Sequence, residues 1–262
     1  MRRMENTATR PIVRWPGGKR RHLKKLLPLI LPHVCYVEVF AGGLAVLLAK
    51  DRSPVEIVND TNRDLVALYR CAQFHLDALI QETEWQLASR INFKDFPENR
   101  GLTDLQRATR FFVSNLTSFA GDGKSFGVAK TDGGGVALNR QRIVDRLTAL
   151  RQRMDRVVVE CLDWKRCVTL YDSADTFFFF DPPYLNAKIN AYAGWTEEQM
   201  RELRDVLQTI KGKWLVTVDG SEFCKKLFSE WNVREIETRN RAVNHRLVAG
   251  AKFSELIITP GE

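Results

Sequence analysis

A carboxylate, two prolines and an aromatic ring stand together in Asp181-Pro182-Pro183-Tyr184, directly after the apolar run Phe177–Phe180. Two adjacent prolines fix the backbone and remove two N–H donors, so this tetrapeptide is stiff. It suits a flat ring that carries an exocyclic amino group: Tyr184 can stack on the ring, while the Asp181 carboxylate and the Pro182 carbonyl accept the amino hydrogens. The alternative is a plain turn after a strand, where Asp and Pro are common.

The chemistry that such a corner can perform is specific. An aromatic amine is a poor nucleophile because its lone pair is delocalised into the ring. Two acceptors outside the ring plane localise that lone pair toward a methyl donor and stabilise the positive charge that develops on nitrogen in the transition state. We therefore expect Asp181, Pro182 and Tyr184 to be the catalytic residues that bind a planar amine and promote its methylation by the donor. The tetrapeptide alone does not distinguish one such amine from another.

A second candidate site lies in Glu38-Val39-Phe40-Ala41-Gly42-Gly43, between a predicted strand and a predicted helix. Glycines allow the backbone to approach a ligand closely, and the N-terminus of the next helix offers N–H groups. Tight packing is the alternative explanation for the glycines. Asp60 ends the next predicted strand, where an acid can accept both hydroxyls of a ribose. The alternative for Asp60 is the N-cap of a helix that starts at Thr61.

An α/β fold must position these residues, because strands and helices alternate on both sides of a long helical stretch. Apolar runs predict strands over residues 36–40, 55–58, 157–159, 177–180, 214–218, 233–238 and 253–259. Helical spacing of apolar residues predicts helices over residues 23–30, 44–50, 64–90, 143–154 and 196–210. Phe223, Leu227 and Trp231 mark a further helix. The capping box Thr103-Asp104-Leu105-Gln106 predicts the start of another.

The order of these elements predicts one α/β domain with a helical insertion. Residues 10–61 and 156–262 are expected to form a mostly parallel sheet, and residues 62–155 to form the inserted helical domain. Only a loop joins the last two strands, which favours an antiparallel hairpin at the sheet edge. Inside the insertion, residues 92–101 are expected to be a polar break and residues 121–135 a glycine-rich loop.

The amino-acid composition indicates which binding partners and which cellular compartment to expect for the protein. The 262 residues hold 40 Lys and Arg against 32 Asp and Glu, a net charge of +8 that suits a polyanion such as nucleic acid. Five scattered cysteines without a C-x-x-C pair are typical of reduced thiols in a cytoplasmic protein, and four dispersed histidines indicate no metal site. No apolar run approaches the length of a membrane span, and we expect neither a secretory signal nor a membrane partner.

Four motifs in a fixed order resemble one known family. They are Arg14-Trp15-Pro16-Gly17-Gly18-Lys19, Val37-Glu38-Val39-Phe40-Ala41-Gly42-Gly43, Val58-Asn59-Asp60 and Asp181-Pro182-Pro183-Tyr184. Together they resemble the Dam-type, D12 class DNA adenine N6-methyltransferases, which use S-adenosylmethionine. The resemblance spans nearly the whole chain. It implies a Rossmann-like methyltransferase sheet, an inserted helical target-recognition domain, methylation of adenine N6 in duplex DNA, and extrusion of the target base from the helix.

The resemblance also implies roles for individual residues. Trp15 and Lys19 would hold the methionine end of the cofactor, with Lys19 pairing with its carboxylate. Phe40, Ala41, Gly42 and Gly43 would surround the methionine and sulfonium region, and Asp60 would take the ribose hydroxyls. Glu38 is also expected to bind the cofactor. Asp163-Trp164 resembles the pair that reads the cofactor adenine, and Asp181 would lie near the cofactor as well as the target base. No metal is implied.

DNA contacts are implied for Arg14, Asn115, Lys124, Arg239, Arg241 and Asn244. The recognition segment here differs from the Asn-rich aromatic stretch of the family's enterobacterial members, so the target sequence stays open. Arginines solvated in the ordinary way are the alternative for the loop that holds Arg239 and Arg241. The motifs also allow an RNA substrate, another planar amine, or a non-catalytic nucleic-acid-binding module. A cognate restriction endonuclease is a further partner that the resemblance allows.

Overall fold

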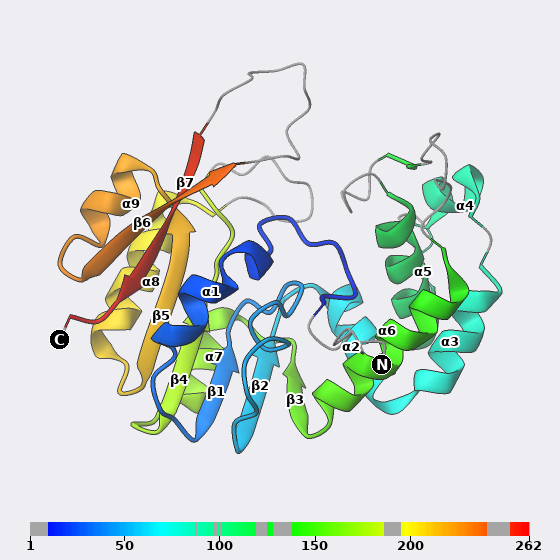
Figure 1. The fold of residues 1–262 in the computed structure, drawn as a ribbon, viewed down its shortest axis with the longest axis horizontal. Coiled ribbons are helices and arrows are strands. Elements are labelled where there is room, and N and C mark those ends of the chain that lie inside the picture. The colour runs from blue at the N-terminus through cyan, green and yellow to red at the C-terminus, as the bar shows by residue number, and fades with distance from the viewer. Residues whose placement is uncertain are drawn as a thin grey trace, which may run out of the picture.

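In the computed structural model, residues 10–86, 88–96, 99, 101–118, 125–127, 138–185, 195–239 and 252–261 are described. Within these ranges, seven strands form one sheet in the order β3-β2-β1-β4-β5-β7-β6 (Figure 1). The strands are β1 (Cys35–Glu38), β2 (Val55–Asn59), β3 (Val157–Glu160), β4 (Thr176–Phe180), β5 (Lys213–Asp219), β6 (Asn232–Arg239) and β7 (Lys252–Thr259). Each of the seven predicted strands is present.

The direction of the strands also agrees with the prediction. Strands β1 to β5 are parallel, with β1 paired to both β2 and β4. Strand β7 runs antiparallel between β5 and β6, so the last two strands form the expected hairpin at one edge. A mostly parallel sheet needs cover on both faces, and the residues of β4 alternate accordingly. Phe177 and Phe179 enter one hydrophobic cluster, and Phe178 and Phe180 enter the other.

Helices cover the two faces differently. On one face, the cluster of Phe178 and Phe180 is closed by α7 (Trp164–Tyr171), α8 (Glu197–Thr209) and α9 (Glu222–Leu227). On the other face, the cluster of Phe177 and Phe179 takes in α1 (Leu23–Leu26), which lies between the short 3₁₀ turns η2 (Lys19–Arg21) and η3 (Leu27–Leu29). The second cluster continues into helices that follow β2, so the core extends beyond the sheet.

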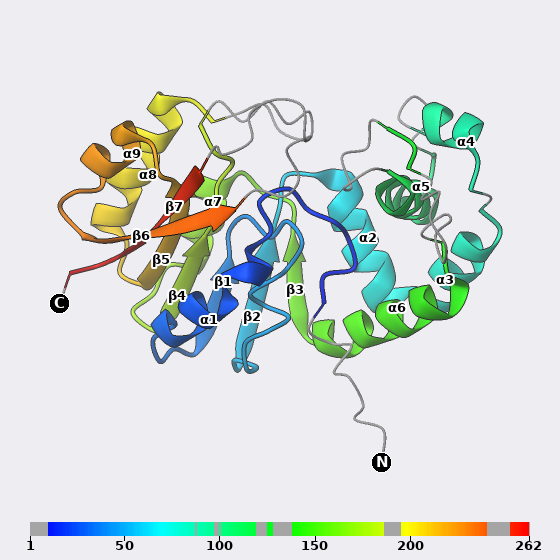
Figure 2. The same ribbon diagram turned by 45° about the horizontal axis from the view of Figure 1, so that its top comes forward.

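Between β2 and β3 the chain is helical in its described residues, beside the β3 edge of the sheet (Figures 1 and 2). The helices are α2 (Arg63–Phe74), α3 (Leu76–Glu84), α4 (Arg90–Asp95), α5 (Asp104–Thr117) and α6 (Arg140–Met154). The capping box at Thr103 and Gln106 is formed and opens α5, as predicted. Most of the expected loop over residues 121–135 lies outside the described residues.

Two predictions inside this helical stretch are wrong. The single helix over residues 64–90 is divided, because His75 leaves helical geometry with φ −133° and ends α2 before α3 begins. The polar break over residues 92–101 begins too early, because α4 continues to Asp95 with Ser89 as its N-cap and Phe93 buried. In both places a local capping or packing contact decides the boundary, which apolar spacing alone does not reveal.

Further element boundaries also differ from the prediction. Residues 44–50 form consecutive turns rather than a helix, because Leu44 adopts φ +59°, which a right-handed helix does not contain. Trp231 lies after the end of α9, where its ring packs edge-on against Trp214. Helix α7 was not predicted at all, although Asp163 caps it through the Lys165 amide.

Within the described residues, no helix is long and apolar enough to cross a membrane.

A buried ion cluster joins the helical stretch to the sheet. The Glu56 carboxylate on β2 accepts hydrogen bonds from both Arg153 terminal nitrogens, at 2.5 and 2.9 Å, and from the Lys50 ammonium at 2.6 Å. Arg153 also donates to the Leu47 carbonyl at 3.1 Å. All three charged side chains are less than 10% exposed. The end of α6 is therefore fixed to β2 and to the turns over residues 44–50.

Breaking this cluster is expected to destabilise the protein strongly. Glu56→Gln leaves two buried cations without their counter-ion, which costs about 3–5 kcal/mol in the free energy of unfolding. Urea unfolding should show a lower midpoint with an unchanged slope. The control is Glu197→Gln, which removes an exposed i,i+4 pair with Arg201 and should change stability by less than about 0.5 kcal/mol. Equal small losses in both variants would contradict the structural role of Glu56.

Candidate active site

The carboxyl ends of β1, β2 and β4 meet at one edge of the sheet. Strand β1 lies between β2 and β4, and the strand order reverses between β1 and β4. In open α/β sheets, ligands bind outside the carboxyl ends of strands at such a switch point. The glycine turn follows β1, Asp60 follows β2, and Asp181 follows β4. The topology therefore brings the separate sequence motifs to one place.

Lys19 is the buried centre of this place. Its ammonium donates to the Asp181 carboxylate at 2.7 Å, to the Tyr184 hydroxyl at 2.9 Å and to the Gly17 carbonyl at 2.7 Å. The residue is 2% exposed, and these three acceptors match the three hydrogens of an ammonium group. Lys19 was predicted to pair with the cofactor carboxylate. The structure gives it a protein partner in the catalytic tetrapeptide.

Asp181 retains an accessible side. Its Oδ1 accepts from Lys19 and from the Thr217 hydroxyl, at 2.7 and 2.8 Å. Its Oδ2 accepts no hydrogen bond from the described residues, and the side chain is 20% exposed. Burial raises the pKa of Asp181, and Lys19 and Thr217 oppose part of that rise. Burial alone would lower the pKa of Lys19, but the Asp181 charge raises it above its ordinary value, so the Lys19 ammonium keeps its proton at neutral pH.

The glycine turn is closed by Trp15. Gly42 has φ +44°, and a Cβ at this position would lie 2.6 Å from the Trp15 indole nitrogen. Glycine is therefore required here by both backbone conformation and space. The Tyr69 hydroxyl donates to the Gly42 carbonyl, and the Gly42 amide donates to Asp60 Oδ2 at 2.9 Å. At Gly43, a Cβ would approach Trp15 to 3.1 Å. Packing, the alternative explanation for the glycines, thus contributes to both of them.

Asp60 is held by backbone amides from both sides. Its Oδ2 accepts from Gly42 and its Oδ1 from Asn62, at 2.9 and 2.8 Å. Each carboxylate oxygen keeps a second acceptor position, which a diol can use. Burial raises the pKa of Asp60, and the two amide contacts oppose the rise. The N-cap alternative is wrong, because the Asn62 side chain caps α2 through the amides of Asp64 and Leu65.

Three aromatic rings lie together beside this edge. The Phe40 ring is 5.3 Å from the Trp195 ring and 6.4 Å from the Trp164 ring, measured between centroids. Trp164 and Trp195 are 5.7 Å apart, and both are buried. Phe40 and Trp164 were predicted as cofactor residues, whereas Trp195 was missed because nothing in its local sequence marks it. Asp163, next to Trp164, is exposed and caps α7.

Comparison with known proteins agrees with this geometry. The family model for D12 class N6 adenine-specific DNA methyltransferase matches residues 15–242. The chain belongs to this family. Its motif resemblance is thereby confirmed, and the protein is an adenine-specific DNA methyltransferase.

Relatives of this D12 class methyltransferase cover it almost from end to end. The type II methyltransferase M1.LlaDCHI of Lactococcus lactis subsp. cremoris is 25% identical over 95% of both chains. The type II methyltransferase M.MjaIII of Methanocaldococcus jannaschii is 26% identical over 90% of this chain and 93% of its own. The DNA adenine methylase of Haemophilus influenzae is 22% identical, over 95% and 92%.

Glu38 of this methyltransferase lies beneath the glycine turn. Its Oε1 accepts from the Leu47 amide at 3.0 Å and from the Tyr36 hydroxyl at 3.3 Å, while its Oε2 is buried without a hydrogen-bond partner in the described structure. Desolvation raises the pKa of Glu38 to about 8. The turns over residues 44–50 wrap around this carboxyl group. Glu38 was predicted to bind the cofactor, and its observed contacts are with the protein.

The residues implied in DNA contact are only partly described. Arg14 is exposed, and its backbone N–H and C=O both pair with the buried Asn115 amide, at 2.8 and 2.9 Å. Asn115 thus links the N-terminal segment to α5, and its contact with DNA stays a prediction. The backbone of Arg239 is in β6, but its side chain is not described. The remaining three, Lys124, Arg241 and Asn244, lie outside the described residues.

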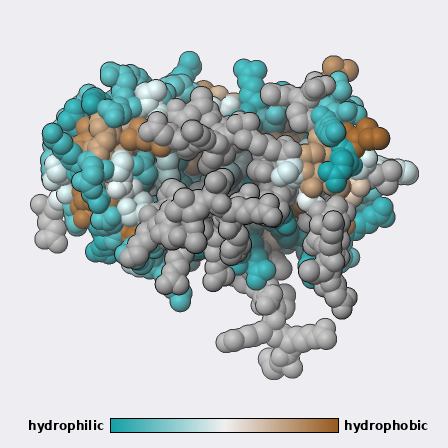
Figure 3. Space-filling view, turned by 90° about the horizontal axis from the view of Figure 1, so that it is seen from above, coloured by the Kyte–Doolittle hydropathy of each residue, from teal (hydrophilic) through white to brown (hydrophobic). Residues whose placement is uncertain are grey.

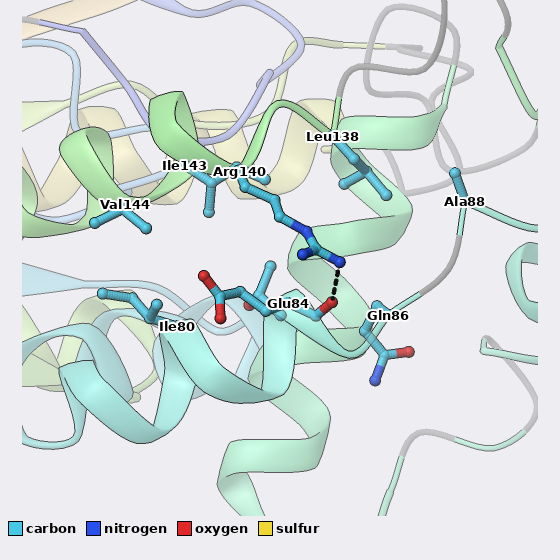
Figure 4. A pocket seen from close by; sticks show the side chains of 9 residues that line it. Ile80, Glu84, Gln86, Ala88, Leu138, Arg140, Ile143 and Val144 are labelled. Carbon is cyan, nitrogen blue, oxygen red and sulfur yellow. Dashed lines mark hydrogen bonds between the residues drawn. The ribbon is translucent and has the colours of Figure 1, made fainter.

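A hollow between α3 and α6 is separate from this site (Figure 4). It is lined by side chains that include Ile80, Ile143 and Val144, and Arg140 donates across it to the Glu84 carbonyl at 3.2 Å. It contains none of the predicted site residues. Among the described residues, no cluster of three His, Cys, Asp or Glu side chains could hold a metal ion.

The pH dependence of stability should report the buried Glu38. A carboxyl group whose pKa is about 8 in the fold and about 4.5 when unfolded stabilises the fold while it is neutral. This stabilisation is complete below about pH 4.5 and is lost as the pH rises to about 8, at about 1.4 kcal/mol per pH unit. Relative to Glu38→Gln, the wild type should therefore lose free energy of unfolding across that window.

Urea unfolding at several pH values measures this difference. Glu198→Gln, which removes an exposed acid on α8, is the matched control and should give a curve parallel to that of the wild type. A Glu38→Gln curve that is also parallel would show that Glu38 is ionised in the fold at neutral pH, and the prediction would be wrong.

Proposed function

We propose that this methyltransferase transfers the methyl group of S-adenosylmethionine to the N6 amino group of adenine in duplex DNA, after the base is turned out of the helix. The observation that carries the proposal is the corner formed by Asp181, Pro182 and Tyr184. The Asp181 side chain is 20% exposed and its Oδ2 accepts no hydrogen bond from the described residues, while Oδ1 is fixed by Lys19 and Thr217. A base inside a duplex is stacked and cannot reach such a recessed carboxylate without leaving the stack.

The residues around the turn fit the proposed cofactor. Asp60 keeps one acceptor position on each oxygen for the ribose hydroxyls. The half-buried Phe40 ring, 6.4 Å from the buried Trp164 ring, offers aromatic surface on which an adenine can pack. Trp15 and the turn over Ala41, Gly42 and Gly43 would bound the methionine part. Lys19 fits less directly, because contact with the cofactor carboxylate requires it to exchange one of its three present acceptors.

Bound S-adenosylmethionine supplies an electrophilic methyl group on a sulfonium centre. The protein's part is to hold the amine and to favour the charge that it gains. Asp181 Oδ2 and the Pro182 carbonyl accept the two amino hydrogens, which localises the nitrogen lone pair. Tyr184, whose hydroxyl is fixed by Lys19, offers its ring for stacking on the base. The nitrogen becomes more positive during transfer, and a fixed carboxylate beside it lowers the barrier.

We propose that residues 62–155 act as the DNA-recognition domain. Helices α2 to α6 lie on one side of the sheet, and basic residues exceed acidic ones in this stretch. Arg146 on α6 donates to the carbonyls of Pro11 and Ile12, at 2.6 and 2.8 Å, and thereby joins α6 to the N-terminal segment. Viewed from above, the described surface is mostly hydrophilic, with apolar side chains in small patches (Figure 3).

The names of two relatives, both type II methyltransferases, support a role beside a cognate restriction endonuclease. A cytoplasmic location is proposed because all five cysteines are free thiols in the described structure. Both proposals concern where the protein works and beside which partner, not the reaction that it catalyses.

The chemistry is tested by methyl transfer from tritium-labelled S-adenosylmethionine to unmethylated DNA, to RNA and to protein. The wild type should label DNA alone, at adenine N6. Asp181→Asn should lose at least about a hundredfold in turnover, because it removes the negative charge that faces the amine. Its affinity for DNA should stay within about threefold, since that carboxylate serves the transition state.

Thr217→Ser is the matched control, because it keeps the hydroxyl that donates to Asp181 and should keep most of the activity. Near-normal methylation by Asp181→Asn would refute the role of this carboxylate. Label in RNA alone would replace the DNA substrate by RNA, and DNA binding without any label would favour the non-catalytic module.

DNA affinity should fall steeply with salt, because phosphate contacts release counter-ions. If Arg14 contacts a phosphate, Arg14→Gln should reduce the slope of log affinity against log salt by about 1. Arg201→Gln, on α8 behind the sheet, is the control and should leave the slope unchanged. The binding can be measured by fluorescence anisotropy of a labelled duplex. An unchanged slope for the Arg14 variant would remove this residue from the DNA interface.

A further inference from the structure

Glu255 is a buried acid that the proposed mechanism does not use. It lies on β7 opposite Asp219 of β5, and its side chain is 12% exposed. Its Oε2 is buried and accepts no hydrogen bond in the described structure, with His22 Nε2 as a neighbour at 3.6 Å. Leaving a buried carboxylate oxygen without a donor is costly, so such an atom needs an explanation.

Glu255 lies beside the corner formed by Lys19, Asp181 and Tyr184. Thr217, whose hydroxyl donates to Asp181 at 2.8 Å, is on the same face of β5 as Asp219, the register partner of Glu255. Its charge contributes to raising the pKa of Lys19, of Asp181 and of Tyr184, the three groups that are hydrogen-bonded around the Lys19 ammonium. The groups that face it come from several elements: Lys19 and His22 from the N-terminal segment, Asp181 and Tyr184 after β4, and Asp219 on β5. On β6 its register partner is the uncharged Ile236.

The charges at this corner show why a second acid matters. Lys19 and Asp181 form a close ion pair, so together they carry no net charge. The target nitrogen becomes more positive during methyl transfer, and a neutral pair stabilises that charge poorly. Burial, together with the Lys19 charge, lowers the pKa of His22, so His22 is neutral at neutral pH and does not cancel an acid. Glu255 adds a second carboxyl group to this corner, against the single ammonium of Lys19.

We propose that Glu255 is a positioning residue for methyl transfer: it offsets the charge of Lys19, so that Asp181 presents an uncompensated negative charge to the target amine. This inference rests on the proposed function, because it concerns the same site. It explains why the carboxylate is kept buried beside Lys19 without a donor. A protein donor that bound Glu255 would screen the negative charge with which Glu255 offsets Lys19.

The test compares wild type, Glu255→Gln, Glu255→Asp and the exposed control Glu198→Gln in the tritium assay on unmethylated DNA. Glu255→Gln should lower kcat about tenfold or more, while the KM values for S-adenosylmethionine and DNA stay within about twofold. Glu255→Asp keeps the charge and should retain most of the rate, and Glu198→Gln should match the wild type. Thermal melting confirms that each variant is folded.

A pH profile of kcat separates this role from a purely structural one. Loss of the Glu255 charge removes a repulsion that raises the pKa of Asp181, so the acid limb of the Glu255→Gln profile should move to lower pH. A structural defect would lower the rate at every pH without moving the limb.

Three results would overturn the inference: a Glu255→Gln rate within about twofold of the wild type, equal losses in the Gln and Asp variants, or a rise in cofactor KM with unchanged kcat. The last result would make Glu255 a cofactor ligand. An inactive wild type would instead overturn the proposed function, so the two failures are distinguishable.

Discussion

The buried ion pair between Lys19 and Asp181 is the constraint on which the active edge depends. Lys19 precedes β1 and Asp181 follows β4, yet their charged atoms are 2.7 Å apart. A buried ammonium is tolerated only when its hydrogens are all accepted, and Asp181, Tyr184 and Gly17 provide this. The tetrapeptide after β4 is therefore rigid for two reasons: its prolines restrict the backbone, and Lys19 holds the side chains on both sides of them.

Three acids lie at the carboxyl ends of three neighbouring strands: Glu38 and Asp60 are buried and Asp181 is half-buried, and each has different hydrogen-bond partners. Glu38 is held by an amide and a hydroxyl, Asp60 by two backbone amides, and Asp181 by a lysine and a threonine. Burial raises the pKa of all three. The Lys19 charge opposes the rise at Asp181, whereas Glu38 has no adjacent cation in hydrogen-bond contact within the described residues. The same residue chemistry thus supports the turn in one place and forms the proposed amine-binding corner in another.

The predictions from the sequence were most accurate for features that depend on interactions between neighbouring residues. The seven strands, the hairpin edge and the capping box at Thr103 depend on neighbouring residues, and the structure contains them. The helix over residues 44–50 was wrong because Leu44 takes φ +59° and the Leu47 amide donates to the Glu38 carboxyl rather than to a helix carbonyl, a contact that exists only in the folded chain. Trp195 and Glu255 were missed for the same reason. Each acquires its place only when another element packs against it, and no local pattern marks such a contact.

The N-terminal segment connects the helical stretch to the active edge of the sheet. Arg14 is fixed by Asn115 on α5, and the carbonyls of Pro11 and Ile12 accept from Arg146 on α6. The adjacent Trp15 packs on Gly42. A few residues further on, Lys19 reaches the carboxylate after β4. One short extended segment therefore contacts the helical stretch, the glycine turn and the catalytic corner. Because Trp15 directly follows Arg14, a shift of α5 relative to the sheet must move the residue that closes the turn. DNA bound by the helices would thus be coupled to the proposed cofactor site through covalent neighbours rather than through a long network of side chains.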